Sequence, residues 1–362
     1  MFHIEKISGR FLACLLLSGA LNAGAQISTI DFIYGGIEDT EKLLQEYIRP
    51  YANILGADLN GGWYTTARPH KLGGLDIMVN ASVAFAPPEA LQYDLAGLAL
   101  NGAVEGNSTL APTAAGQMND RPSLVYSQTF DYNGTPQTVE IARFLHPDGT
   151  GIDFVPMPMG QLTVGLPLGT DISVRYVPTI AFRDYGEIGL WGVGGKHSIS
   201  QYIPVIKKLK FLDISLQGGY TQVTASTQIH VQPMPVDVVT VDPLYWDDQF
   251  VALEISGWTA NLIVSESIPF LNLYQSVGYA GSSCEVEMTG HYPVNTLVTE
   301  GADMGKVTYT VVENPIDMEF ENYRNLRYNA GVRLTLGIFM LYYDFSHTLY
   351  STHTAGFGIT FR

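Results

Sequence analysis

The segment 60–71 concentrates side chains whose chemistry suits the binding of a small molecule. Two aromatic rings, a guanidinium, a proline ring and an imidazole stand within eight positions of the chain. Ligand sites combine apolar surfaces with a few convergent polar groups, and this segment offers both. Aromatic residues of this kind also serve as interior packing, which is their commoner role. The residues that we predict to bind a ligand are Trp63, Tyr64, Arg68, Pro69 and His70.

The sequence carries no complete motif for catalysis, nucleotide binding or metal binding. The glycine-rich stretch 192–197 resembles a phosphate loop, but Leu190 stands where the first glycine is required and His197 replaces the hydroxyl residue. The eight histidines show no paired-ligand spacing, and no Gly-x-Ser-x-Gly elbow is present. The acidic pair at 247–248 lacks the spacing of a calcium loop. We therefore expect a protein that is not an enzyme and has no cofactor and no metal.

The C-terminal segment indicates which elements must surround these residues. Apolar residues occupy every second position of 326–338, and the alternation returns in 339–345 and 355–361. This period predicts strands with one apolar face. A polar opposite face suits a wet lumen, with the apolar face against lipid, so the pattern predicts an all-β, transmembrane outer-membrane β-barrel. The charged residues on the lumen-facing side are Arg327, Arg333 and Asp344.

The composition agrees with a membrane barrel. Only 15% of the 362 residues are charged, and 11% are aromatic, including 21 tyrosines. No segment after the N-terminus approaches the ~18 consecutive apolar residues of a transmembrane helix. Half of each barrel strand faces water, which keeps the mean hydropathy modest. The net charge of −16 argues against nucleic acid as a partner, because a nucleic-acid-binding protein presents a basic face.

Residues 1–25 have the pattern of a signal peptide. Lys6 and Arg10 precede a short apolar run, and Ala23-Gly24-Ala25 forms a small-residue cleavage site. The rest of the chain divides into an N-terminal helical plug segment at 26–72 and the transmembrane barrel at 73–362.

The plug segment contains a predicted helix at 38–55. Leu43, Leu44, Tyr47 and Ile48 recur at helical spacing. Pro50 lacks an amide hydrogen, which predicts that the helix stops or kinks near Arg49. We expect this helix to start on the periplasmic side and to bury its apolar face in the barrel lumen.

The periodicity predicts twelve strands, and one weak pair within 87–120 or 300–320 would make the favoured number, fourteen. If the C-terminus is periplasmic, the turns at 132–135, 167–169, 266–271 and 337–338 are periplasmic and short, and the long acidic connections lie outside. The predicted strands lie near 75–85, 121–131, 136–146, 158–166, 170–180, 184–195, 211–228, 249–265, 272–290, 326–336, 339–349 and 354–361.

Three segments carry a family resemblance: the loop 60–71, the stretch 192–208 and the C-terminal end from Asn329 to Arg362. On these segments the chain resembles an uncharacterised outer-membrane family of Bacteroidota-type bacteria, whose architecture is similar to FadL-like and PorV-like barrels. The resemblance implies a fourteen-stranded barrel with an N-terminal helical plug and no established substrate. The fatty-acid-binding residues of FadL have no matching motif in this sequence.

The resemblance leads us to expect a protein of the Gram-negative cell outer membrane with FadL-like passive uptake of a small hydrophobic molecule. The alternative is a non-transporting, PorV-like interaction or scaffold protein. The expected partners are the lipid bilayer with its lipopolysaccharide, the outer-membrane assembly machinery and a small hydrophobic ligand, and no nucleic acid. An apolar lumen pocket would favour transport, whereas a filled lumen beneath acidic outer loops would favour scaffolding.

Overall fold

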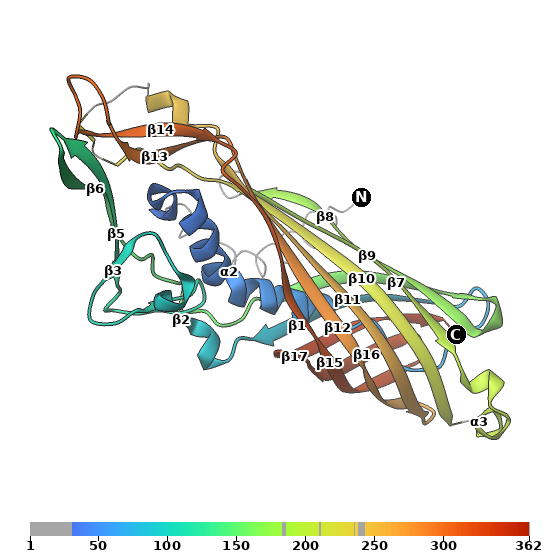
Figure 1. Cartoon of the computed structure of the whole chain (residues 1–362). Coiled ribbons are helices and arrows are strands. Elements are labelled where there is room, and N and C mark those ends of the chain that lie inside the picture. Colours follow the sequence, from blue (N-terminus) through green and yellow to red (C-terminus); the bar gives the residue numbers. More distant parts are fainter. Residues whose placement is uncertain (1–30, 183–185, 210, 235, 238–242, 362) are drawn as a thin grey trace.

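In the computed structural model, ten antiparallel strands close into one barrel (Figure 1). The structure describes residues 31–182, 186–209, 211–234, 236–237 and 243–361, so the predicted signal peptide at 1–25 lies outside the described residues. The barrel closes between its first and last strands, where Leu75 pairs with Phe361 and Phe85 with Ser351. The strands are β1 (Leu75–Phe85), β7 (Met157–Leu166), β8 (Thr170–Phe182), β9 (Gly186–Ser198), β10 (Leu212–Gln228), β11 (Phe250–Ser267), β12 (Leu271–Thr289), β15 (Ile316–Leu336), β16 (Phe339–His347) and β17 (Ser351–Phe361).

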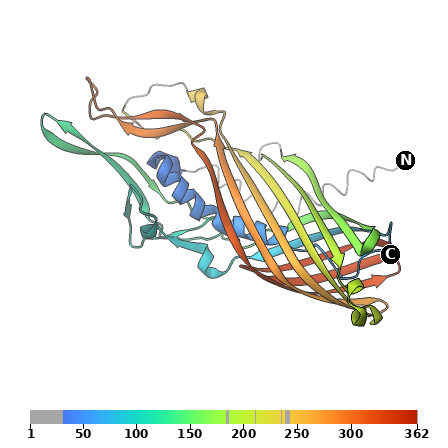
Figure 2. The ribbon, with the colours of Figure 1, turned by 45° about the vertical axis from the view of Figure 1, so that its right-hand side comes forward.

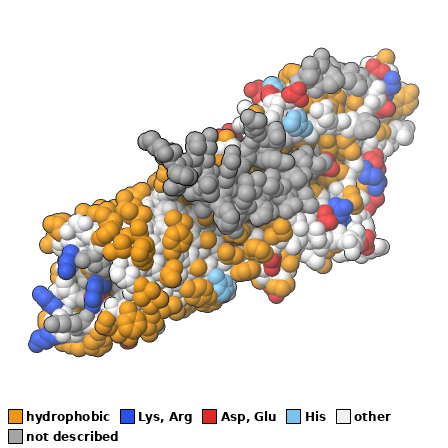
Figure 3. Space-filling model, turned by 180° about the vertical axis from the view of Figure 1, so that it is seen from behind, with side chains coloured by type: hydrophobic (Ala, Val, Ile, Leu, Met, Phe, Trp, Pro, Cys, Tyr) orange, Lys and Arg blue, Asp and Glu red, His pale blue; other side chains and the backbone are white. Residues whose placement is uncertain are grey.

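The alternation along each strand sorts side chains between the two faces of the wall. In β16, Leu341 and Tyr343 are 56% and 44% exposed, whereas the alternate residues Tyr342 and Asp344 are buried. Figure 3 shows hydrophobic side chains gathered over the outside of the barrel. The predicted barrel with an apolar outer face and a polar inner face is therefore confirmed, and the lumen-facing residues Arg327, Arg333 and Asp344 are all buried.

The predicted number of twelve to fourteen barrel strands is wrong, because two of the twelve segments lie outside the barrel. β5 (Ser123–Tyr132) and β6 (Thr135–Leu145) form a separate sheet with β3 (Ala103–Glu105), and β1 pairs directly with β7. The distal half of this hairpin is exposed on both faces and rich in Ser, Thr and Gln, so it offers no apolar face to lipid. The turn 132–135 is consequently the tip of an outer hairpin.

The two ends of the barrel differ in the size of their connections (Figure 2). At one end, which we call the short-turn end, the strands are joined at 167–169, 268–270 and 337–338, and by a connection with η5 (Ser200–Tyr202) and α3 (Pro204–Lys208). At the opposite end the connections build an outer region. It contains η2 (Pro88–Leu91), β2 (Gln92–Asp94), η3 (Leu95–Leu98), β3, β4 (Leu110–Pro112), β5, β6, η6 (Pro243–Trp246), β13 (His291–Leu297) and β14 (Val307–Glu313).

The N-terminal helix joins the outer region to the barrel. η1 (Asp31–Gly35) and the first half of α2 (Ile37–Leu59) lie among the outer sheets, and the helix then runs into the barrel mouth (Figure 1). We expected the helix to start on the side where the first strand starts, and this is wrong, because α2 starts at the opposite end of the barrel. It also continues through Pro50, because its long buried face compensates for the one missing backbone hydrogen bond.

The main hydrophobic core lies where α2, the outer sheets and the upper barrel wall meet. It is an interior of aromatic and aliphatic side chains that come from all three parts. No helix among the described residues is long and apolar enough to cross a membrane. Residues of this core include Phe32, Leu43, Leu44, Tyr47, Leu124, Tyr126, Phe144, Ile255, Val286 and Phe320.

Candidate functional site

The barrel lumen is occupied by residues 60–72, which we call the plug loop. This loop connects the C-terminal end of α2 to the start of β1, and its residues from Asn60 to Ala67 are all buried. Gly62 has a φ of +67°, which lets the chain turn away from the helix axis. All five predicted ligand-binding residues belong to this loop, so the lumen is the candidate functional site.

Trp63 fits into a recess of the wall that glycine residues create. A Cβ atom at Gly194 would lie 2.6 Å from the Trp63 ring, and one at Gly219 would lie 2.5 Å from it. On another side the guanidinium carbon of Arg175 lies 3.7 Å from a ring centroid of Trp63, which is a cation–π contact. Gly194, from the glycine-rich stretch that resembles a phosphate loop, thus forms part of the recess that holds the Trp63 ring.

Arg175 of β8 also binds the backbone at the turn from α2 into the plug loop. Its Nη1 donates to the carbonyl oxygen of Leu59 at 2.8 Å, and its Nη2 donates to that of Gly61. Its Nε donates to Oε1 of Gln161 at 2.8 Å, and Gln161 donates in turn to the carbonyl oxygen of Trp63. A cation is favourable at a helix C-terminus, so Arg175 both caps α2 and holds the loop.

Tyr64 contacts the opposite part of the wall. Its hydroxyl is hydrogen-bonded to Ser276 Oγ and accepts from Nη1 of Arg327 at 3.1 Å. Its ring packs edge-on against Tyr274, with 6.0 Å between the centroids. Within the wall, the hydroxyl of Tyr274 on β12 donates to Oδ2 of Asp344 on β16 at 3.2 Å.

His70 lies in a buried ion cluster made by His70, Asp76, Asp171, Lys196 and Arg333. Nε2 of His70 is 2.8 Å from Oδ1 of Asp76, and Nδ1 is 3.1 Å from Oδ2 of Asp171. Lys196 Nζ lies 3.1 Å from Asp171, and Arg333 Nη1 lies 3.0 Å from Asp76. Asp171 and Asp76 thus each have a cationic partner, Lys196 and Arg333 respectively, in spite of their burial.

Arg68 and Pro69 lie at the short-turn end of the plug loop. The side chain of Arg68 is 41% exposed, and its Nε donates to Oδ2 of Asp213 at 2.8 Å. Nearby, the backbone is held by Lys196, whose Nζ donates to the carbonyl oxygen of Thr66 at 3.0 Å. Pro69 is half-buried. The loop is therefore anchored to the wall at its end as well as in its middle.

The five predicted residues follow one another along the lumen and face different strands. A cavity of about 20 Å³ lies beside Trp63, Tyr64 and His70 and has room for roughly one water molecule. Binding of a ligand by these residues stays a prediction. Among the described residues, no group of three His, Cys, Asp or Glu is arranged to hold a metal ion.

Sequence reasoning identified the loop residues but missed most of their partners. Arg175, Asp171 and Lys196 occupy inward positions of strands, where alternation marks them as lumen-facing without indicating what they contact. Gly219 carries no side chain and gives no signal of its own. The observable clue was the number of charged residues at inward positions, because buried charges require partners.

Comparisons with known proteins identify a family model that matches the chain and several solved structures of low similarity. Residues 5–361 match a model described as a family of unknown function (DUF6588). A comparison with curated proteins found no match. Among solved structures, the attachment invasion locus protein Ail of Yersinia pestis is 7% identical with a TM-score of 0.27, over 80% of this chain and 100% of that one.

Two further structures give similar values. The translocator domain of the autotransporter NalP from Neisseria meningitidis is 8% identical with a TM-score of 0.29, over 81% of this chain and 90% of that one. The toluene transporter TbuX of Ralstonia pickettii is 10% identical with a TM-score of 0.18, over 81% and 90%. With scores this low, neither the binding properties nor the activities of these proteins transfer to this chain.

Proposed function

Because the chain belongs to a family of unknown function, DUF6588, we propose its function from the geometry of the barrel and its plug. We propose that it is a sealed barrel of the Gram-negative outer membrane that holds an interaction region at the cell surface. It acts as a non-transporting scaffold and not as an enzyme. The observation that carries this proposal is the lumen, which the plug loop fills and fixes to the wall through buried hydrogen bonds and ion pairs.

The outer surface of the wall supports placement in a membrane. Large apolar side chains such as Leu341, Phe357 and Phe361 point outward and are 48–60% exposed. A lumen with buried Arg175, Arg327 and Arg333 and an apolar exterior is the arrangement of outer-membrane barrels. Short turns at one end and large connections at the other match the periplasmic and cell-surface ends of such barrels. The lipid bilayer and lipopolysaccharide are thus its proposed surroundings.

The outer region supports the interaction role. It is an ordered structure that packs on α2 and bonds across its own parts, for example from Asn295 Nδ2 to the carbonyl oxygen of Ile141 at 2.7 Å. Its exposed surface carries many acidic side chains (Figure 3). The sequence reasoning associated a filled lumen beneath acidic outer parts with a scaffold, and the described residues have this combination.

Single-channel recording in planar bilayers tests the seal. We expect the refolded protein to conduct no measurable steps, because the plug loop occupies the lumen. A variant with residues 63–70 replaced by an equal-length Gly-Ser sequence should conduct, since the chain still connects but its side chains no longer fill the barrel. The matched control replaces the exposed turn 299–304 in the same way and should stay closed. Wild-type conductance equal to that of the loop variant would contradict the proposal.

FadL-like uptake of a small hydrophobic molecule is the second candidate, and one cavity favours it. An apolar cavity of about 50 Å³ lies between α2 and the wall, lined by Tyr51, Leu55, Ile255 and Cys284. A dry cavity of ~150 Å³ holds benzene, so uptake would require α2 to move away from the wall. Uptake of a fluorescent fatty acid by cells separates the candidates. Transport should fall when Cys284→Trp fills the cavity, and a scaffold should transport nothing in either form.

A further inference from the structure

Ten strands of the wall run from one end of the barrel to the other. The chain makes the same crossing once more, through the lumen, with α2 and the plug loop. We infer that the barrel places Asp31 and the first half of α2 on the cell-surface side, and that the plug loop is the segment that returns through the lumen to the periplasm. Asp31 and Phe361 then lie on opposite sides of the membrane. This inference rests on the proposed function, in which the short-turn end is periplasmic.

The first described residues belong to the interior of the outer region. The ring of Phe32 packs against Phe144 and His146, with centroid distances of 6.4 and 5.3 Å. The hydroxyl of Tyr34 donates to the carbonyl oxygen of Gln232 at 2.6 Å. Phe144 and His146 come from the connection between β1 and β7, which lies beyond the mouth. The beginning of the described chain is therefore fixed on the outer side.

Helix α2 then leads inward. Near its middle, the carbonyl oxygen of Ala52 accepts from Nδ2 of Asn322 at 3.1 Å. One turn later the helix is so close to the wall that a Cβ at Gly56 would lie 2.1 Å from Ser282 Oγ. At its end, Asn60 Nδ2 donates to the carbonyl oxygen of Gly281 at 3.1 Å. The helix thus enters the barrel between Ala52 and Asn60.

The plug loop completes the crossing at the short-turn end. The backbone amide of Gly73 donates to the carbonyl oxygen of Gly165 at 3.0 Å, next to the turn at 167–169. β1 starts at Leu75 and runs back toward the outer region, where it ends at Phe85. Ten strands alone return the chain to its original side. The helix and plug loop add an eleventh crossing.

This path limits the order of assembly. β1 is the direct continuation of the plug loop, and it is also the strand that closes the barrel by pairing with β17. Once closed, the wall surrounds Trp63, which packs against Gly194, Gly219 and Arg175, and this packing leaves no room for α2 to pass. A chain that begins in the periplasm after removal of the predicted signal peptide must therefore move its N-terminal helix outward before β1 and β17 pair. The open barrel serves as the route for its own first segment.

Labelling of single cysteines on intact cells tests the inference. Cys284 is buried and Cys14 lies in the predicted signal peptide, so the background is low. We would use a maleimide on a polymer too large for porins. Glu38→Cys, on the exposed start of α2, should label as strongly as Ala302→Cys on an outer turn. Lys71→Cys and Lys208→Cys, at the short-turn end, should label only after permeabilisation.

The two turn reporters separate the inference from the proposed function. If Ala302→Cys labels and Lys208→Cys does not, while Glu38→Cys stays protected, the inference fails and the proposed orientation stands. If Lys208→Cys labels and Ala302→Cys does not, the proposed orientation fails and the inference fails with it. Lys42→Cys on the next turn of α2 repeats the measurement should Glu38→Cys not reach the heat-modifiable, folded form.

Discussion

At the residue scale, the seat of Trp63 shows how closely the plug loop fits the wall. Because a Cβ at Gly219 would lie 2.5 Å from the ring, Gly219→Ala should destabilise the folded barrel by about 1–3 kcal/mol. Its neighbour Gly218 points away from the lumen, and a Cβ there meets nothing nearer than 3.9 Å. Gly218→Ala is therefore the control. Urea unfolding in lipid vesicles would compare the two, and equal stability would mean that Trp63 does not occupy this seat.

We expect His146 to make the stability of the outer region depend on pH. Burial lowers the pKa of its imidazole to about 4, while Nδ1 lies 2.8 Å from the carbonyl oxygen of Pro147 and Nε2 lies 2.7 Å from the Tyr93 hydroxyl. The folded state therefore keeps His146 neutral. The neutral imidazole therefore adds to the free energy of unfolding above the unfolded-state pKa of His146, which is about 6.5. This contribution, about 3 kcal/mol in total, is lost as the pH falls toward 4.

We expect amide exchange around His146 to accelerate between pH 7 and pH 5, after correction for intrinsic rates. The variant His146→Phe keeps a ring among Phe32, Tyr47 and Tyr93 but cannot be protonated. Its corrected exchange should change much less over the same range. An identical acceleration in both proteins would assign the effect to another group.

Only the plug-loop residues of the candidate site were predictable from the sequence, and their partners on the wall were not. Trp63, Tyr64 and His70 stand close together in the sequence, and their types mark them. Their partners Arg175, Ser276 and Asp171 come from strands far apart along the chain. Only strand register brings them to the lumen, and register depends on pairings between distant segments.

At the element scale, the plug loop is held by ion pairs of two kinds. Asp171 is buried with Lys196 and His70, whereas Asp213 pairs with the half-exposed Arg68. Removal of one buried partner leaves uncompensated charge and costs about 3–5 kcal/mol, while an exposed pair contributes about 0–1 kcal/mol. Asp171→Asn should therefore loosen the plug loop, and Asp213→Asn should leave it almost unchanged.

Single-channel recording would detect this difference as brief openings of the Asp171→Asn protein. The Asp213→Asn protein should remain as quiet as the wild type. Openings of equal frequency in both variants would show that burial of the ion cluster is not what holds the loop.

The errors in the predicted elements have a common physical origin. Alternation reports that a strand has two different faces, but it does not report whether lipid or other protein covers one of them. β5 and β6 therefore resembled barrel strands although they lie in the outer region. The helix was predicted correctly from its apolar spacing, but spacing carries no information on direction. Its N-terminal half contacts segments that follow it by a hundred residues, such as Tyr47 with Asp148.

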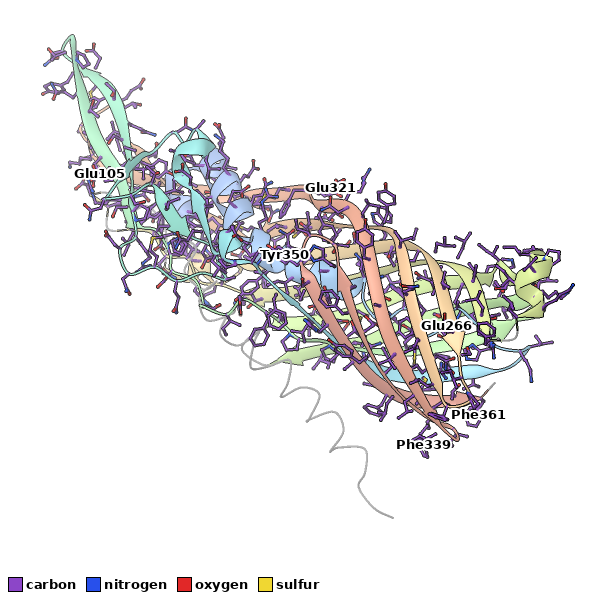
Figure 4. The ribbon with its side chains drawn as sticks, turned by 90° about the horizontal axis from the view of Figure 1, so that it is seen from below. Glu105, Glu266, Glu321, Phe339, Tyr350 and Phe361 are labelled. Carbon is purple, nitrogen blue, oxygen red and sulfur yellow. The ribbon has the colours of Figure 1, made fainter. Side chains whose placement is uncertain are left out.

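At the scale of the whole molecule, we expect assembly of the barrel to depend on its last strand. Phe361 faces outward at the short-turn end and is 48% exposed, in the same rim as Phe339 at 63% (Figure 4). We expect the assembly machinery to read Phe361, so Phe361→Asp should abolish insertion. Phe339→Asp places the same charge on the same rim, where the depth-dependent cost is small near the interface. It should leave most of the insertion intact.

The amount of heat-modifiable barrel in isolated outer membranes measures both variants. A normal amount of the Phe361→Asp barrel would refute the role of this residue. An equal loss in both variants would point to the rim charge itself and not to recognition.

The fit between the plug loop and the wall also limits how the barrel can change in evolution. Within residues 60–72, side chains and backbone contact strands on all sides, through Arg175 of β8, Asp213 of β10, Ser276 of β12 and Arg333 of β15. A duplicated hairpin would widen the circumference, and each of these contacts would open at once. Relatives with a different number of strands are therefore expected to carry a different plug loop. Within this lineage, barrel size and loop sequence can change only together.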